Sequence, residues 1–233
     1  MSLAEFDLRY LKAIPAVIGV DEAGRGPLAG PVCAAAVYLD RDFYAASWNR
    51  EYGPLINDSK QLPESVREEI YDTILETGVG QIHFACHMAS VDEIENLNIL
   101  GATRLAMARC IQSLLDDTVC PAREIYEGEA SLFGMATGPA CAHVLVDGKP
   151  LKPFPHLHTA IVKGDGKSLA IALASIIAKV TRDRFMRKQA EEYPEYGFVT
   201  NKGYGTKAHI AALKSAGPCK LHRMSFLTQI LSA

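Results

Sequence analysis

The chain is organised around the stretch Val17-Ile18-Gly19-Val20-Asp21-Glu22-Ala23-Gly24-Arg25-Gly26-Pro27. Its first four residues are apolar and predict a buried strand, which ends in two adjacent carboxylates and a Gly-Arg-Gly-Pro turn. Because successive strand side chains point to opposite faces, Asp21 and Glu22 reach one site only where the strand ends and the backbone bends. Acids at the end of a core strand are costly to desolvate unless a cation or hydrogen bonds compensate. The alternative is a turn aspartate beside a solvated glutamate.

Two later strands end in the same way. Residues 143–146 are mostly apolar and lead into Asp147-Gly148, and residues 159–162 lead into Lys163-Gly164-Asp165. Ligands bind at the strand ends of α/β sheets, so we expect Asp21, Glu22, Asp147 and Asp165 to share one small volume. The alternative for Asp165 is an N-cap of the helix that follows.

Four carboxylates in one volume predict divalent cations. Two carboxylates about 4 Å apart repel by roughly 4 kcal/mol at an effective dielectric constant near 20. Oxygen-only ligation favours Mg²⁺ or Mn²⁺ over zinc. Two such ions activate a water molecule and stabilise the leaving oxygen of a phosphodiester.

The composition is typical of a globular protein. The chain has 233 residues, of which 48% are hydrophobic and 22% charged, enough for one larger domain or a domain with an appendage. We find no apolar run long enough to cross a bilayer and no signal-peptide pattern, so we expect a cytoplasmic protein without a membrane partner. Six scattered cysteines without a CxxC pair predict reduced thiols rather than disulfides or a zinc site.

Charge is divided unevenly along the chain. Residues 1–148 carry 10 Lys+Arg and 22 Asp+Glu, a balance of −12, whereas residues 149–233 carry 14 and 5, a balance of +9. This asymmetry predicts that the C-terminal third faces a polyanion. The alternative is that the basic residues serve solubility alone.

The remaining pattern is that of alternating strands and helices. Strands are predicted over residues 32–39 and 81–88, and helices after Pro63, from the capping box at 90–93 with a break near Gly101, and over 168–193. Residues 40–54 and 127–142 are predicted to be loops, the second an insertion. The Gly164–Ser168 segment is similar to the phosphate loop of NTPases, but position 161, where that loop needs glycine, is isoleucine.

Several segments together resemble bacterial ribonuclease HII over nearly the whole chain. They include residues 17–31, Asn57-Asp58-Ser59-Lys60, 97–100, Val146-Asp147-Gly148, Lys163-Gly164-Asp165, 174–183, 196–198, Lys202-Gly203-Tyr204 and 222–226. The resemblance implies a ribonuclease H-like α/β fold: a five-stranded mixed sheet flanked by helices (residues 1–190) and a small helical C-terminal extension (residues 191–233). It also implies cleavage of RNA in RNA–DNA hybrids and at RNA–DNA junctions, with a 5′-phosphate and a 3′-hydroxyl as products, and no obligate protein partner.

The resemblance also implies roles for individual residues. The metal ligands and catalytic residues are the four carboxylates named above, with Mg²⁺ or Mn²⁺ bound as two ions in the substrate complex. The Gly24-Arg25-Gly26 turn is expected to grip the ribose, and Tyr204 to stack on the deoxyribose that follows. Further substrate contacts are expected from Ser59 and Lys60. The basic C-terminal third adds candidates for a phosphate-facing surface: Lys179, Arg182, Lys202, Lys207 and Arg223.

The chain departs from the family pattern at three places. The segment before Val144 is longer than usual, Ala172 stands where serine is expected, and Met224 stands where arginine is usual. The last change is expected to weaken one phosphate contact.

Two other functions fit parts of the pattern. A non-catalytic nucleic-acid-binding protein would use the basic third, but gains nothing from four carboxylates near phosphates. A metal-dependent DNA nuclease of the same broad fold would lack any contact that requires a ribose 2′-hydroxyl.

Overall fold

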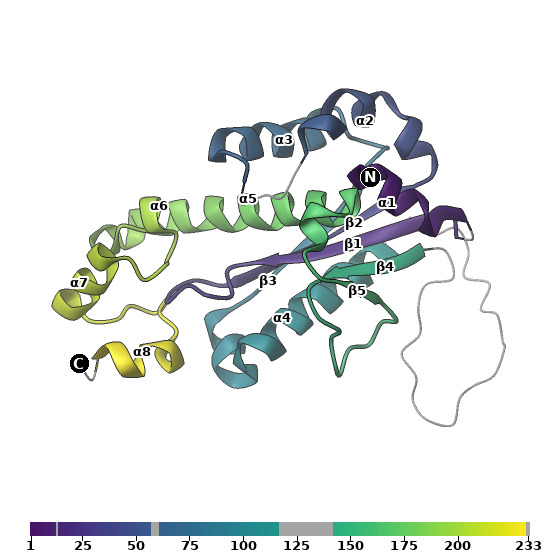
Figure 1. The fold of residues 1–233 in the computed structure, drawn as a ribbon. Coiled ribbons are helices and arrows are strands. Elements are labelled where there is room, and N and C mark those ends of the chain that lie inside the picture. The colour runs from purple at the N-terminus through teal and green to yellow at the C-terminus, as the bar shows by residue number, and fades with distance from the viewer. Residues whose placement is uncertain (13, 57–60, 117–141, 232–233) are drawn as a thin grey trace.

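A mixed five-stranded sheet forms the centre of the molecule (Figure 1). The computed structural model describes residues 1–12, 14–56, 61–116 and 142–231. The strands are β1 (Ala16–Ala23), β2 (Val32–Asp40), β3 (His83–Ala89), β4 (Ala142–Asp147) and β5 (Thr159–Ile161), in the order β3-β2-β1-β4-β5. The β1–β2 and β2–β3 pairs are antiparallel, and the β1–β4 and β4–β5 pairs are parallel. The predicted ribonuclease H-like α/β fold is confirmed.

Helices cover both faces of this sheet. They are α1 (Leu3–Leu8), α2 (Ser47–Tyr52), α3 (Glu64–Glu76), α4 (Val91–Asp116), α5 (Leu169–Glu192), α6 (Phe198–Asn201), α7 (Lys207–Ala216) and α8 (Met224–Leu231). One buried cluster joins α1, α3 and α5 to one face of the sheet, and a second joins α4 to the other face (Figure 1). The C-terminal helices extend past one end of the sheet.

Strand β1 is buried on both faces because it lies between these two layers. Val17 belongs to the cluster under α5, while Ile18 and Val20 belong to the cluster under α4. Gly19 faces the first turn of α5 so closely that a Cβ atom there would lie 2.1 Å from the backbone carbonyl carbon of Ala170. A glycine is needed here for the helix to rest directly on the strand that carries Asp21.

The helix starts agree with the sequence prediction. Ser90 and Glu93 form the predicted capping box, with each side chain accepting from the other residue's backbone N–H. Helix α3 begins directly after Pro63, and α5 begins after Ser168, whose hydroxyl accepts from the Ile171 N–H. Local chemistry is therefore enough to set these boundaries.

Three local predictions were wrong in detail. The break in α4 lies at Asn98 (φ 56°) rather than at Gly101, because the Asn98 carboxamide accepts from the N–H groups of Leu100 and Gly101 and restarts the helix. Residues 40–54 are not a loop but short helices whose aromatic side chains enter the core, including Trp48. Strand β3 spans His83–Ala89 rather than residues 81–88.

Other predictions fall partly outside the described residues. The predicted insertion over 127–142 does so up to residue 141, and Ala142 opens β4. The predicted boundary between residues 190 and 191 falls inside α5, and the division into two parts stays a prediction. Within the described residues, no helix is both long and apolar enough to cross a membrane.

Candidate active site

The four predicted carboxylates lie at the ends of three neighbouring strands. Asp21 and Glu22 are near the end of β1, Asp147 ends β4, and Asp165 lies in the 3₁₀ turn Gly164–Gly166 after β5. Since β1, β4 and β5 are parallel, these ends lie along the same edge of the sheet. Asp21 and Asp165 are each only 4% exposed. The N-cap interpretation of Asp165 is wrong, because Ser168 caps α5.

Asp21, Glu22 and Asp147 lie close enough for their charges to interact. The pKa of Asp21 is raised well above its usual value, first by burial and then by the charges of Glu22 and Asp147. Hydrogen bonds from Ser175 on α5 and from the Glu22 N–H (2.7 Å) oppose that rise. The third acid, Asp147, accepts a 2.6 Å hydrogen bond from the Gly164 N–H, which ties the end of β4 to the turn that carries Asp165.

The donor set of this edge fits a hard divalent cation. All four side chains offer carboxylate oxygens, and a cation would stabilise the charged form of the buried Asp21. Across the part of the chain that the structure describes, no group of three or more His, Cys, Asp or Glu side chains is already arranged to hold a metal ion. One carboxylate oxygen of Glu22 pairs with Arg25 at 3.1 Å.

The turn after β1 is held in place by two buried arginines. Arg223 donates to the carbonyl oxygens of Gly24, Arg25, Pro27 and Gly30, at 2.6 to 3.0 Å. Arg182 of α5 donates to the carbonyl oxygens of Ala29, Pro31 and Lys202, at 2.9 to 3.0 Å. Their exposed fractions are 0% and 1%. Both guanidiniums thus satisfy backbone carbonyls, chiefly those of residues 24–31, here called the glycine loop, and their contact with substrate phosphates stays a prediction.

A glycine is required where the loop passes Arg182. Gly24 has a φ of 93°, and a Cβ atom there would lie 2.0 Å from the Arg182 Nε. Only glycine adopts this positive φ without strain and also leaves room for the guanidinium beside it.

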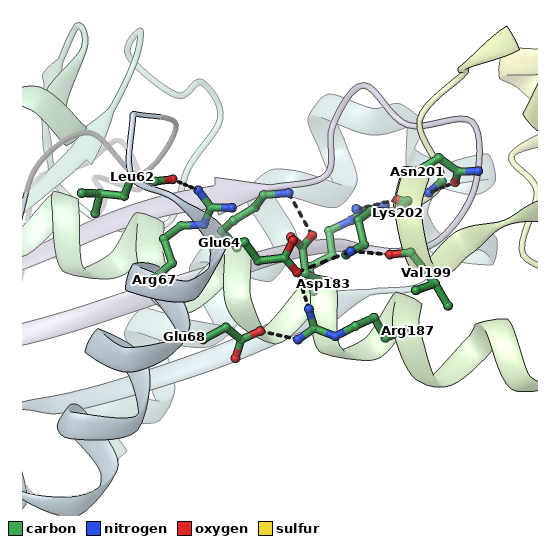
Figure 2. A network of polar contacts seen from close by, with 12 residues as sticks. Leu62, Glu64, Arg67, Glu68, Asp183, Arg187, Val199, Asn201 and Lys202 are labelled. Atoms are coloured by element: carbon green, nitrogen blue, oxygen red, sulfur yellow. Dashed lines mark hydrogen bonds and ion pairs between the residues drawn. The ribbon is translucent and has the colours of Figure 1, made fainter. Parts of the chain in front are cut away.

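Lys202, a third predicted phosphate contact, is also buried. Its ammonium group donates to the Val199 carbonyl (2.5 Å) and lies 3.5 Å from a Glu64 carboxylate oxygen (Figure 2). Glu64 belongs to an ion-pair network in which Arg187 of α5 binds both Glu64 and Glu68 of α3. Lys202 therefore links the C-terminal part to α3, and its phosphate contact stays a prediction.

Tyr204 lies beside the glycine loop. Its side chain is 43% exposed, and a Cβ atom on Gly26 would lie 4.0 Å from its ring. The half-buried Lys179 pairs with Asp183 at 2.9 Å, and its ammonium lies 5.8 Å from the Tyr204 ring centroid. The structure thus brings Tyr204, Gly26 and Lys179 together, while Lys207 lies exposed on α7. Ser59 and Lys60 lie outside the described residues.

A buried histidine pair, which the sequence analysis missed, binds the backbone carbonyl of Tyr204. His209 Nδ1 donates to the Tyr204 carbonyl (2.9 Å), and His222 Nδ1 accepts from the Cys219 N–H (3.0 Å). These partners leave the Nε2–H on His222, which donates to His209 Nε2 at 3.0 Å. Burial lowers the pKa of both rings, that of His222 to about 4 with help from His209. No spacing in the sequence signals this pair, because the two histidines are thirteen residues apart on different segments.

The comparisons with known proteins agree with this geometry. The family model for Ribonuclease HII matches residues 18–229. The chain belongs to the ribonuclease HII family. A Ribonuclease HII from Fusobacterium nucleatum is 45% identical over 97% of this chain and 90% of its own length. As a ribonuclease HII, the protein is a metal-dependent endoribonuclease that cleaves the RNA strand of RNA–DNA hybrids.

Solved structures agree on the fold of this ribonuclease HII. Ribonuclease H2 from Pyrococcus horikoshii superposes with a TM-score of 0.64 at 22% identity, covering 93% of this chain and 97% of that one. Bst-RNase HIII in complex with Mn²⁺ superposes with a TM-score of 0.66 at 20% identity, covering 94% and 70%. At these identities the likeness shows the fold alone.

Proposed function

We propose that Asp21, Glu22, Asp147 and Asp165 are the metal ligands of this ribonuclease HII, with two Mg²⁺ or Mn²⁺ ions bound in the substrate complex. One observation carries the proposal: Asp21, whose pKa is raised first by burial and then by the charges of Glu22 and Asp147, lies at the edge where β1 and β4 end in parallel. Divalent ions at this edge supply a Lewis acid for the scissile phosphate and an activated water. The Mn²⁺ complex of Bst-RNase HIII supports a divalent ion in a protein of this fold.

The chain's own residues prepare this edge. Ser175 and the Glu22 N–H hold the Asp21 carboxylate by hydrogen bonds, and the Gly164 N–H fixes Asp147. These donors favour the ionised carboxylates and oppose part of the rise that burial causes in the pKa of Asp21. Hydrolysis at this edge leaves a 5′-phosphate and a 3′-hydroxyl.

Recognition of ribose is assigned to the glycine loop and Tyr204. Backbone groups of residues 24–26 read a 2′-hydroxyl without base contacts, since it is both a donor and an acceptor. The exposed Tyr204 ring next to Gly26 stacks on the following deoxyribose. The substrates are therefore hybrids, RNA–DNA junctions and single ribonucleotides in duplex DNA, encountered in the cytoplasm without an obligate protein partner.

The test of this assignment replaces each acid by its amide. Asp21→Asn, Glu22→Gln, Asp147→Asn and Asp165→Asn should each abolish most cleavage of a hybrid duplex, with an unchanged or higher melting temperature because a repelling charge is removed. The matched control is Glu191→Gln, an exposed carboxylate on α5 that should leave cleavage unchanged.

Metal dependence is measured on the same substrate. EDTA should inactivate the protein, and Mg²⁺ or Mn²⁺ should restore it. Full cleavage by Asp147→Asn, or by the native protein in EDTA, would contradict the assignment.

A further inference from the structure

Two cysteines of neighbouring strands are in direct contact. Cys33 is the second residue of β2 and Cys86 lies within β3, and their Sγ atoms are 3.3 Å apart. In the ladder Cys33 pairs with Met88 and Cys86 pairs with Ala35, so the two cysteines are diagonal neighbours on one face. Diagonal side chains of antiparallel strands are within reach of each other.

The two thiols differ in environment. Cys33 is fully buried, whereas Cys86 is half-buried. The hydrogen bond between them raises the pKa of Cys33 and lowers the pKa of Cys86, which favours Cys86, the more accessible residue, as the attacking thiolate. The nearby Cys110 behaves differently: its thiol donates to the Ala34 carbonyl at 3.2 Å, and burial raises its pKa.

We propose that Cys33 and Cys86 form a redox-active dithiol that a peroxide converts reversibly into a disulfide. The Cys86 thiolate attacks a peroxide oxygen; the O–O bond breaks, hydroxide leaves as water after protonation, and Cys86 becomes a sulfenic acid. The Cys33 sulfur then attacks the Cys86 sulfur, the S–O bond breaks, and the hydroxyl leaves as water with the Cys33 proton. Each sulfur is oxidised by one electron overall, and hydrogen peroxide is reduced to two water molecules.

The register also predicts that the bond is reducible. Cα atoms of diagonal neighbours are about 7–8 Å apart in a regular antiparallel pair, whereas disulfides usually join Cα atoms 4.4–6.8 Å apart. Closing the bond therefore draws β2 and β3 locally together, and strained bonds of this kind are the more easily reduced. A thiol reductant should reopen it.

The site lies beside the catalytic strand. Cys33 pairs with Ala23, the residue after Glu22, and Pro31 two residues earlier accepts from Arg182 at 2.9 Å. The dithiol thus lies at the point where the glycine loop enters β2.

The experiment treats the reduced full chain with hydrogen peroxide, alkylates the remaining thiols, and maps the peptides by mass spectrometry. We expect alkylation to fall from six to four thiols, one cross-linked peptide pair containing Cys33 and Cys86, and recovery of six thiols after dithiothreitol. Cys86→Ser and Cys33→Ser should each abolish the cross-link, and the control Cys219→Ser, a half-buried thiol elsewhere, should retain it.

Circular dichroism first establishes that each serine variant is folded, and Cys86→Ser alone is sufficient if the core variant Cys33→Ser does not fold. The proposal is overturned if native protein retains six thiols. It is overturned equally if Cys86 is found only as a sulfinic acid, or is cross-linked to a cysteine other than Cys33.

Discussion

Arg223 offers a sharp test of whether the glycine loop depends on a buried cation. Its guanidinium is 0% exposed and donates to four backbone carbonyls of the loop. Replacement by alanine removes all four donors together and leaves a space in the packing. The glycine loop contains three glycines and two prolines among its eight residues, and its carbonyls depend on partners from elsewhere in the chain.

The magnitude follows from the number of carbonyls. A buried acceptor that loses its partner costs about 1–3 kcal/mol. At the lower limit for each of the four carbonyls, Arg223→Ala should lower the free energy of unfolding by about 4 kcal/mol. For a protein of this size, each kcal/mol lowers the melting temperature by about 2–4 °C. The expected decrease is therefore roughly 8–16 °C.

A phosphate-binding arginine would behave differently. Its loss would leave the melting temperature unchanged and would reduce the slope of the log–log salt dependence of duplex binding by about 0.9. Thermal unfolding and binding of a hybrid in EDTA at several salt concentrations separate the two roles. Lys207→Ala, at an exposed cation on α7, is the matched control for stability. A native melting temperature combined with a reduced salt slope for Arg223→Ala would refute the structural role.

Three further predictions concern stability and substrate choice. Burial raises the pKa of Asp7 to about 6 from 3.8, so ionisation of Asp7 destabilises the fold as pH rises from about 4 to 6. At pH 8, Asp7→Asn should therefore melt at a higher temperature than the native protein, with a free energy of unfolding higher by up to about 3 kcal/mol. This gain should shrink towards pH 4. Gly19→Ala should lower stability by about 3 kcal/mol in chemical denaturation, because its Cβ has no room against Ala170, whereas Gly166→Ala, with nothing within 4 Å of its Cβ, should lose less. Tyr204→Ala should slow cleavage at an RNA–DNA junction more than cleavage of a long hybrid, and Tyr204→Phe should lose little; equal slowing of both substrates would make the tyrosine merely structural.

The sequence allowed the strand ends to be predicted because they depend on local order. An apolar run followed by an acid and a small-residue turn places Asp21, Asp147 and Asp165 at strand ends whatever the rest of the chain does. That β1, β4 and β5 are neighbours and parallel could not be derived from the pattern, and only the structure shows it. Helix starts such as Ser90 and Ser168 were equally predictable, since a cap is a contact across three residues.

Positions that depend on distant contacts were not predictable. Residues 40–54 look polar and aromatic, and only packing against the first core cluster turns them into helices around Trp48. The break in α4 needs a residue that can adopt a positive φ. The pattern pointed to Gly101, but Asn98 adopts this conformation instead, because its side chain can hydrogen-bond locally.

The basic C-terminal third shows the same limit for function. Its positive balance predicted a surface for phosphates, but Arg182, Arg223 and Lys202 direct their charges inwards. A glycine- and proline-rich loop cannot satisfy its own carbonyls through regular secondary structure, so these groups must bind donors from elsewhere. Arginine, with five donors in a fixed plane, satisfies several carbonyls at once. A cation that follows a catalytic motif by 150 residues or more can therefore support a loop as readily as it binds substrate, and charge counting does not distinguish the two. The two roles differ in burial, which only the folded structure shows. Replacing a buried arginine should lower the stability of the fold first, and affinity for nucleic acid only as a consequence.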